Sequence, residues 1–170
     1  AIGGFIIFLF TITTKYYQPD IALASLIFAG ACAGFLIFNR HPAKIFLGEG
    51  GSLFIGFVLG VLAIISGGKI AIALLVLGIP ILDVFWTIIR RVLKRKNPFK
   101  FADRKHLHHR LMDMGLTPQK TVLVFYAFSA FFGIAGLFLQ SIGKVLAVSV
   151  LVLIMLIIVI TFSLIDKKKI

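Results

Sequence analysis

Acidic residues are scarce in this 170-residue sequence, which holds six Asp and Glu against eighteen Lys and Arg. Charged residues make up 14% of the chain, whereas they make up about a quarter of a soluble globular protein. Hydrophobic residues make up 60%, and the mean hydropathy is +1.09. A soluble domain of this length needs a polar exterior that these residues cannot supply. The composition therefore excludes a soluble domain and predicts an integral membrane protein.

The sequence also has only one cysteine and none of the features of a signal peptide. The single Cys32 excludes an internal disulfide bond, and its place in an apolar run indicates a packing role. The chain begins at Ala1 without a Met, and its first apolar run has neither a basic segment before it nor a small-residue cleavage pattern after it. We therefore expect the chain to be a fragment of a longer protein.

Long apolar runs make up most of the chain. A transmembrane helix needs about 20 predominantly apolar residues, and runs of that order recur between segments that contain charge, Gly or Pro. The runs show no fixed-period repeat and no alternation typical of barrel strands. We predict an all-α integral membrane protein in which residues 1–170 form a single transmembrane domain, a polytopic bundle of about six transmembrane helices. The predicted spans are residues 1–14, 21–38, 52–66, 69–89, 121–140 and 143–165.

The basic residues predict how these helices are oriented. Lys and Arg accumulate in the cytoplasmic loops of membrane proteins. Fifteen of the eighteen Lys and Arg residues lie in residues 39–52, 90–120 and 166–170. Along the chain, these segments alternate with the loops predicted on the opposite side of the membrane. We therefore predict a cytoplasmic Gly-rich loop at residues 39–52 and a cytoplasmic basic, His-containing loop at residues 90–120. Such short basic loops suit anionic lipids or phosphate ligands better than a nucleic acid.

Two pairs of glycines have spacing that favours close packing of helices. Gly30 with Gly34, and Gly56 with Gly60, are four residues apart, which lets helix backbones approach each other closely. The pairs predict contacts either within the chain or between two copies in a homodimer. Tyr126 is expected to lie at the inner interface as an aromatic anchor.

The Gly-rich loop contains the first candidate site. Pro42 restricts the backbone, the glycines at 48, 50 and 51 permit tight turns, and Glu49 places a carboxylate just before a predicted helix. A carboxylate at a membrane surface suits Mg²⁺, which proteins hold with one or two carboxylates plus substrate phosphates. The alternative is that Glu49 only stabilises the start of a helix whose N-cap is Ser52.

The basic loop contains the second candidate site. His106, His108 and His109 lie within four positions and are flanked by Arg104 and Arg110, a cluster that suits a diphosphate because histidine charge adjusts near neutral pH. If this segment is helical, His106, His109 and Arg110 share one face. Clustered histidines also bind zinc or iron, although the surrounding cations would repel a metal ion. A solvated basic loop that touches anionic lipid explains residues 90–100.

Asp83 is the third candidate, because it lies inside an apolar run. An ionisable group within the membrane is expected to have a function. Asp83 either takes part in the site directly or pairs with Arg90, Arg91 or a donor from a loop and thereby supports the site.

These motifs resemble one known family. Residues 39–57, then Pro80-Ile-Leu-Asp83 with Arg90-Arg91, then Asp103-Arg-Lys-His-Leu-His-His-Arg-Leu111 are similar in order and spacing to the polyprenyl-phosphate N-acetylhexosamine-1-phosphate transferases. The His-Leu-His-His form is closer to the WecA/TagO branch than to the MraY branch, in which three consecutive histidines are usual. The resemblance places this chain in the C-terminal half of such an enzyme.

The resemblance implies a function. It implies a Mg²⁺-dependent transfer, with Mn²⁺ as a possible substitute, in which an oxygen of polyprenyl phosphate attacks the β-phosphorus of a UDP-N-acetylhexosamine and UMP is released. UDP-GlcNAc and undecaprenyl phosphate are the expected substrates, in cell-envelope polysaccharide synthesis. The expected location is a bacterial or archaeal plasma membrane, with the active face toward the cytoplasm.

The same resemblance assigns roles to residues. It implies that Glu49 binds the metal ion, that Phe46 stacks on uracil, and that His106, His108 and His109 bind the nucleotide phosphates. The catalytic set on this reading is Glu49, Asp83 and the three histidines. The substrate-binding residues are expected to be Asn39, Lys44, Phe46, Gly48, Asp103, Arg104 and Arg110.

Two departures from the family pattern affect these expectations. Glu49 stands where the family usually has Asp, and its longer side chain would shift the ion or the loop. The family's paired-aspartate motif and its Asn/Asp-rich motif do not appear in this sequence, so we expect the isolated chain to be inactive.

Two other classes of function stay open at this point. Six spans with an intramembrane Asp83 are compatible with half of a transporter, although the polar motifs gather at one membrane face. A non-catalytic protein could use the polybasic loop to bind anionic lipid headgroups or to assemble with other proteins.

Overall fold

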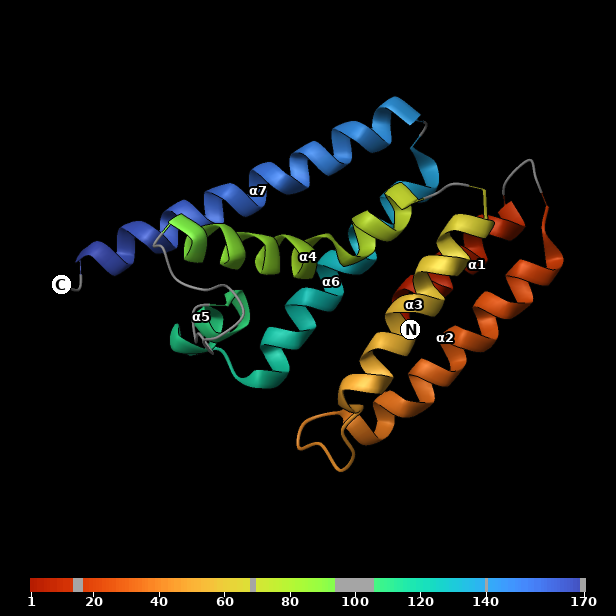
Figure 1. Ribbon diagram of the computed structural model, residues 1–170, viewed down its shortest axis with the longest axis horizontal. Coiled ribbons are helices and arrows are strands. Elements are labelled where there is room, and N and C mark those ends of the chain that lie inside the picture. Colours follow the sequence, from red (N-terminus) through yellow and green to blue (C-terminus); the bar gives the residue numbers. More distant parts are fainter. Residues whose placement is uncertain (14–16, 68–69, 94–105, 140, 169–170) are drawn as a thin grey trace.

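Seven helices and no strands are present in the described part of a computed structural model, which covers residues 1–13, 17–67, 70–93, 106–139 and 141–168. The prediction of an all-α membrane protein is confirmed (Figure 1). Each of the six predicted apolar runs forms a helix, and one short helix, α5, lies between the helices formed by the fourth and fifth runs. The helices are α1 (Ile2–Thr13), α2 (Pro19–Asn39), α3 (Gly48–Ile65), α4 (Ile70–Leu93), α5 (Leu107–Asp113), α6 (Pro118–Phe138) and α7 (Ser141–Lys168).

The predicted number of about six spans is not confirmed. Four helices, α2, α3, α4 and α6, are long and apolar enough to cross a membrane. Helix α1 has 12 residues and a length of about 18 Å, which is less than the roughly 30 Å of a hydrocarbon core. The described apolar part of α7, Ile142–Ile158, is also shorter than the other spans. The chain is a multi-pass membrane protein with four spans of full length among the described residues.

The helices pack around α1 and α4. Helix α1 packs against α2 and α6, and α4 packs against α6 and α7 (Figure 1). Ile6 and Phe10 of α1 meet Ile72 and Val76 of α4 in one apolar cluster. A second cluster joins α1 to α3, and a third joins α4 to α6 and α7. These contacts join the helices to one another in the halves that lie away from the Gly-rich segment.

The loop-bearing ends of α2 and α3 are less covered. The buried residues of α2 are Ala22, Ser25 and Ala29, which all lie in its first half. Those of α3 are Leu59, Leu62 and Ala63, which lie in its second half. The ends of these helices that meet at residues 40–47 therefore have few packing partners among the described residues. This arrangement leaves space beside the Gly-rich segment.

Close helix contacts involve glycines other than the predicted pairs. A Cβ atom at Gly4 would lie 2.9 Å from a ring carbon of Phe28 and 3.1 Å from the carbonyl oxygen of Ser25. Gly30, Gly34, Gly56 and Gly60 have no such neighbour within 4 Å. Of the two predicted uses of these pairs, close packing within the chain is therefore not seen among the described residues.

Gly4→Ala is expected to lower the thermal stability of the protein, because the added methyl group meets a ring and a backbone oxygen that cannot both move away. Overpacking of this kind costs about 1–3 kcal/mol. Gly30→Ala is the matched control, since the added methyl group meets no neighbour and alanine favours a helix. Thermal unfolding in detergent measures the melting temperatures of the two variants. Equal melting temperatures for Gly4→Ala and Gly30→Ala would contradict the close approach of α1 and α2.

Candidate functional site

Asp83 connects α4 to the start of α5. Its carboxylate is largely buried, with 9% of the residue exposed. Oδ2 lies 2.9 Å from Nδ1 of His106, and Oδ1 accepts a 2.9 Å hydrogen bond from the backbone N–H of Leu107. Both carboxylate oxygens are therefore used, as a buried polar group requires. The pairing of Asp83 with donors from the segment after α4 is one of the forms of the predicted supporting role.

The Asp83 carboxylate caps α5 from outside the helix. Helix α5 has seven residues, too few to be stable alone, and His106 at its N-cap makes no side-chain capping bond. The Leu107 N–H is one of the backbone donors that a helix leaves unsatisfied at its start. Asp83 satisfies this donor and also places a negative charge at the positive end of the helix. The position of α5 thus depends on a residue of α4.

The same contact orients the ring of His106. A carboxylate only accepts hydrogen bonds, so Nδ1 of His106 donates and Nε2 is left for another partner. Thr87 lies one turn after Asp83 on α4, and its Oγ1 is 3.5 Å from the same Nδ1. This arrangement matches the carboxylate–histidine pairs that fix a ring in other functional sites.

The three histidines form a stacked group. The ring centroids of His106 and His108 are 5.7 Å apart with nearly parallel planes, and those of His108 and His109 are 4.1 Å apart. His106 has extended backbone angles and precedes α5. The shared face of His106, His109 and Arg110 was predicted for a helical segment; His106 itself lies just before the helix, where Asp83 holds it in the capping position.

The surroundings of His108 disfavour its charged form. Partial desolvation lowers the pKa of His108 below the ordinary value of 6.5, and the neighbouring His109 and His106 lower it further. Asp83 acts in the opposite direction and raises this pKa. His108 is therefore a neutral donor and acceptor at neutral pH, and an anion bound nearby would favour its protonation.

The Gly-rich segment is folded back onto the end of α2. The side-chain amide of Asn39 donates a 2.9 Å hydrogen bond to the Ile45 carbonyl oxygen, and the Lys44 backbone N–H donates one of 2.8 Å to the Phe38 carbonyl oxygen. Asn39 therefore shapes this segment, while the Lys44 side chain is exposed. The Phe46 ring is 80% exposed, so its face is open to a planar ligand.

Glu49 lies in the first turn of α3. The helix begins at Gly48, which has φ of +71°, a backbone conformation that glycine adopts without strain. Glu49 is exposed, and a carboxylate at this position is stabilised by the helix dipole, as the alternative reading predicted. The prediction of Ser52 as N-cap is wrong, because Ser52 lies inside the helix and its hydroxyl donates to the Gly48 carbonyl oxygen.

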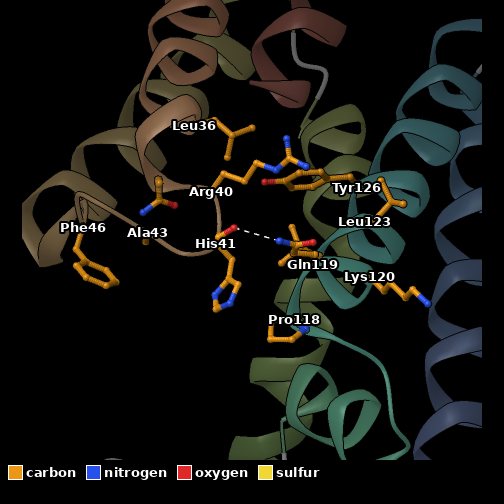
Figure 2. Close-up of a pocket in the computed structure, with 12 residues that line it drawn as sticks. Leu36, Arg40, His41, Ala43, Phe46, Pro118, Gln119, Lys120, Leu123 and Tyr126 are labelled. Atoms are coloured by element: carbon orange, nitrogen blue, oxygen red, sulfur yellow. Dashed lines mark hydrogen bonds between the residues drawn. The ribbon is translucent and has the colours of Figure 1, made fainter.

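A cavity lies between the end of α2 with its following segment and the first turns of α6. Its volume is about 820 Å³, and Asn39 and Phe46 are among its lining residues (Figure 2). Sequence reasoning missed five polar lining residues, although the exposed Arg40 and His41 lie in the Gly-rich segment itself and Tyr126 was expected at the interface. These residues are Arg40, His41, Gln119, Lys120 and Tyr126.

One hydrogen bond joins the two predicted loops. The side-chain amide of Gln119 donates to the His41 carbonyl oxygen at 3.2 Å (Figure 2). The start of α6 thus contacts the Gly-rich segment, and α5 packs against α6. His106, His108 and His109 do not line the cavity. The structure therefore brings the histidines together with Asp83, and Phe46 together with Asn39, but as two separate groups.

No three His, Cys, Asp or Glu side chains converge on a metal-binding position in the described part of the chain. A zinc or iron centre made by the three histidines is not seen among these residues. A Mg²⁺ ion held mainly by phosphate oxygens needs as few as one protein carboxylate, and the exposed Glu49 fits that mode of binding. Asp103 and Arg104, which were also predicted as site residues, lie outside the described residues.

Comparisons with known proteins identify relatives of the chain. Residues 1–67 match the sequence profile of glycosyl transferase family 4. A protein of Bacillus subtilis described as a probable undecaprenyl-phosphate N-acetylglucosaminyl 1-phosphate transferase is 42% identical over 123 residues, which cover 69% of this chain and 34% of that protein. The chain is related to these transferases. The predicted resemblance is confirmed.

Two further relatives support the same assignment. A decaprenyl-phosphate N-acetylglucosaminephosphotransferase of Mycobacterium tuberculosis is 35% identical over 128 residues, 65% of this chain and 31% of that protein. A phospho-N-acetylmuramoyl-pentapeptide-transferase of Moorella thermoacetica is 32% identical over 125 residues, 74% of this chain and 39% of that protein. The chain thus spans about a third of the length of these relatives. No solved structure matches it.

Asp83→Asn is expected to change the tautomer of His106. The amide oxygen still accepts from Leu107, but the amide nitrogen cannot accept from Nδ1, so Nδ1 loses its proton and Nε2 gains it. Nitrogen-15 chemical shifts of the histidine ring report the tautomer directly. Asp113→Asn, at the exposed end of α5, is the matched control. An unchanged tautomer in Asp83→Asn would show that this contact does not orient His106.

The pKa of His108 is expected to shift in opposite directions in two variants. His109→Gln removes a neighbour that lowers this pKa, so the pKa should rise, whereas Asp83→Asn removes a neighbour that raises it, so the pKa should fall. Titration of the His108 ring by NMR measures both shifts. Shifts of the same sign, or none, would show that the charges around His108 differ from those described.

Proposed function

We propose that this chain provides the phosphate-binding part of an enzyme that transfers N-acetylhexosamine 1-phosphate from a UDP-sugar to polyprenyl phosphate. GlcNAc 1-phosphate is the proposed group, undecaprenyl phosphate the proposed acceptor and UMP the second product. The observation that carries this proposal is the pairing of Asp83 with His106 and the start of α5, which presents a histidine group beside a membrane span. The relatives support the reaction class, since two of their names describe N-acetylglucosamine phosphate transfer with undecaprenyl or decaprenyl phosphate, and the third describes a phospho-N-acetylmuramoyl-pentapeptide transferase.

The reaction brings two anions together, so the site must offset phosphate charge before the acceptor can approach. An oxygen of the lipid phosphate forms a bond to the β-phosphorus of the UDP-sugar, and the bond from that phosphorus to the bridging oxygen breaks, so the electron pair leaves with UMP. Bound Mg²⁺ would stabilise the negative charge on the phosphate oxygens. Glu49 is the residue of this chain that would hold the ion.

The other residues of the chain bind and orient the donor in this proposal. His108 and His109 donate hydrogen bonds to phosphate oxygens, and the lowered pKa of His108 lets it respond to bound charge. His106 is held by Asp83 with Nε2 available, and Asp83 acts as a positioning residue because both of its oxygens are already used. Phe46 offers an exposed ring for the uracil. Because Phe46 and the histidines bind the same UDP-sugar in this proposal, the Gly-rich segment and α5 must both contact that molecule.

The proposed location follows from the chemistry. UDP-sugars are made in the cytoplasm, and the histidines lie in the most basic loop of the chain. A hydrogen bond from Gln119 to His41 joins the end of that loop to the segment before Glu49. We therefore place the active face at the cytoplasmic side of a bacterial plasma membrane. The lipid phosphate reaches this face laterally from the inner leaflet.

Glu49→Gln is expected to lower UMP release by at least about 100-fold, because it removes the charge that binds the metal ion. The protein expressed from its complete gene is assayed in membranes that lack a similar enzyme, with UDP-GlcNAc, undecaprenyl phosphate and varied Mg²⁺. Glu49→Asp, which keeps the carboxylate, should retain activity with a changed Mg²⁺ requirement.

Asp20→Asn is the matched control, since Asp20 is also an exposed acidic residue in the first turn of a span, at the opposite end of α2. It should leave UMP release unchanged. Full activity of Glu49→Gln would remove Glu49 from the metal site. Absence of release from the folded natural protein with UDP-GlcNAc, UDP-GalNAc and other UDP-N-acetylhexosamines would contradict the transferase proposal.

A further inference from the structure

Thr87 is a buried residue of α4 to which the proposed reaction gives no role. It lies one turn after Asp83 on the same face of the helix, and 3% of the residue is exposed. Its Oγ1 atom is 3.5 Å from Nδ1 of His106, the atom that also lies 2.9 Å from Oδ2 of Asp83. One ring nitrogen of His106 therefore meets two polar side chains from successive turns of one helix.

The contact of Thr87 differs from those of other hydroxyl groups inside the helices. A Ser or Thr hydroxyl within a helix often donates to the carbonyl oxygen four residues earlier. Thr11, Ser52 and Ser149 do so in this chain. Within the described part of the chain, the Thr87 hydroxyl makes its one hydrogen bond with His106. A buried hydroxyl group needs a partner, so this contact satisfies Thr87 as well as holding the ring.

The proton on His106 decides the role of the Thr87 hydroxyl. The Asp83 carboxylate only accepts hydrogen bonds, so Nδ1 of His106 has the proton. The Thr87 oxygen then accepts from the same N–H group, as the second and weaker acceptor of a three-centre hydrogen bond. Nε2, which lies across the ring from this contact, stays available for a ligand.

Two acceptors fix the His106 ring where one would not. A single hydrogen bond tolerates a range of angles, so Nδ1 can pivot about Oδ2 of Asp83 without losing that bond. A second oxygen in the next turn of α4 limits this movement, and Thr87 suits the role because its β-branched side chain is stiff at χ1. The ring is also attached to the chain through Cγ, and His108 stacks on it. A fixed Nδ1 therefore sets the direction of Nε2.

We propose that Thr87 is a second positioning residue for His106, which holds Nδ1 between its own Oγ1 and Oδ2 of Asp83 and thereby directs Nε2 toward a phosphate oxygen of the sugar-nucleotide donor. The phosphate oxygen only accepts hydrogen bonds, so Nε2 donates to it, and the bound ring has a proton on each nitrogen. The identity of this ligand rests on the proposed transfer function, whereas the fixing of the ring does not.

The test compares variants of the protein expressed from its complete gene, in detergent and with isotope-labelled histidine. Thr87→Val keeps nearly the same shape and removes the hydroxyl group, whereas Thr87→Ser keeps the hydroxyl group. Thr121→Val is the matched control. Thr121 is as buried as Thr87, with 2% exposed, but its hydroxyl group has no hydrogen-bond partner among the described residues. His106→Gln identifies the NMR signals of the His106 ring.

NMR relaxation of the His106 ring should give a clearly lower order parameter in Thr87→Val than in the natural protein, with the Nδ1–H tautomer unchanged. Thr87→Ser should restore most of the order, and Thr121→Val should show no loss. In the assay of UMP release, Thr87→Val should raise KM for UDP-GlcNAc about two- to tenfold, as the loss of one ordinary hydrogen bond does. The value of kcat should change little, because Nε2 contacts the donor both before and during the transfer.

Several outcomes overturn the proposal. Unchanged ring order in Thr87→Val shows that the hydroxyl group does not fix the ring. An equal loss of order in Thr121→Val, or no recovery in folded Thr87→Ser, shows that the ring responds to packing in general. A raised KM with unchanged ring order shows that Thr87 acts by another route than His106, and an unchanged KM with a loosened ring removes the role toward the donor.

Thr87→Ala takes the place of Thr87→Val if the valine variant does not fold, and the same loss of ring order is expected. The ring is measured without any substrate. A natural protein that releases no UMP therefore contradicts the transferase proposal, while the order parameters still decide whether Thr87 fixes His106.

Discussion

The buried carboxylate of Asp83 is the constraint on which the arrangement of the histidine group depends. A carboxylate inside a membrane bundle costs several kcal/mol unless its oxygens are satisfied. Asp83 meets this requirement with the ring of His106 and the backbone of Leu107, both from the segment that follows α4. The need to satisfy one buried charge therefore brings a short helix back onto the span that precedes it. Without this contact, seven residues have no intrinsic tendency to stay helical.

A second feature is that the bundle is packed tightly at one end and open at the other. The apolar clusters of α1, α3, α4 and α6 lie toward the end opposite the Gly-rich segment, and Gly4, which closely approaches α2, lies there as well. The loop-bearing end is held by single hydrogen bonds from Asn39 and Gln119 rather than by an apolar core. Proteins commonly carry ligand-binding residues on segments that are less tightly packed and that a rigid scaffold holds in place. The loop-bearing end of this bundle fits that description.

The sequence predicted the fold class and the position of each apolar helix, because apolar runs of membrane-spanning length are a strong local signal. It did not predict that α3 begins at Gly48 rather than at Ser52, since glycines just before an apolar run resemble a turn. It gave Asp83 and the histidines as candidates, but not their contact across 23 positions, which depends on tertiary packing. The cavity was missed for the same reason, because its walls come from segments 78 positions apart in the sequence.

The bond between Gln119 and the His41 carbonyl oxygen ties the start of α6 to the segment that leads into the turn of Glu49. Asn39, Arg40, His41, Ala43 and Phe46 line the cavity from this side, and Glu49 follows Phe46 by three positions. A ligand that draws α6 and this segment together therefore also changes the setting of the Glu49 carboxylate. Thermodynamic linkage makes such an effect reciprocal, so a cation held at Glu49 would alter the affinity for that ligand by the same factor.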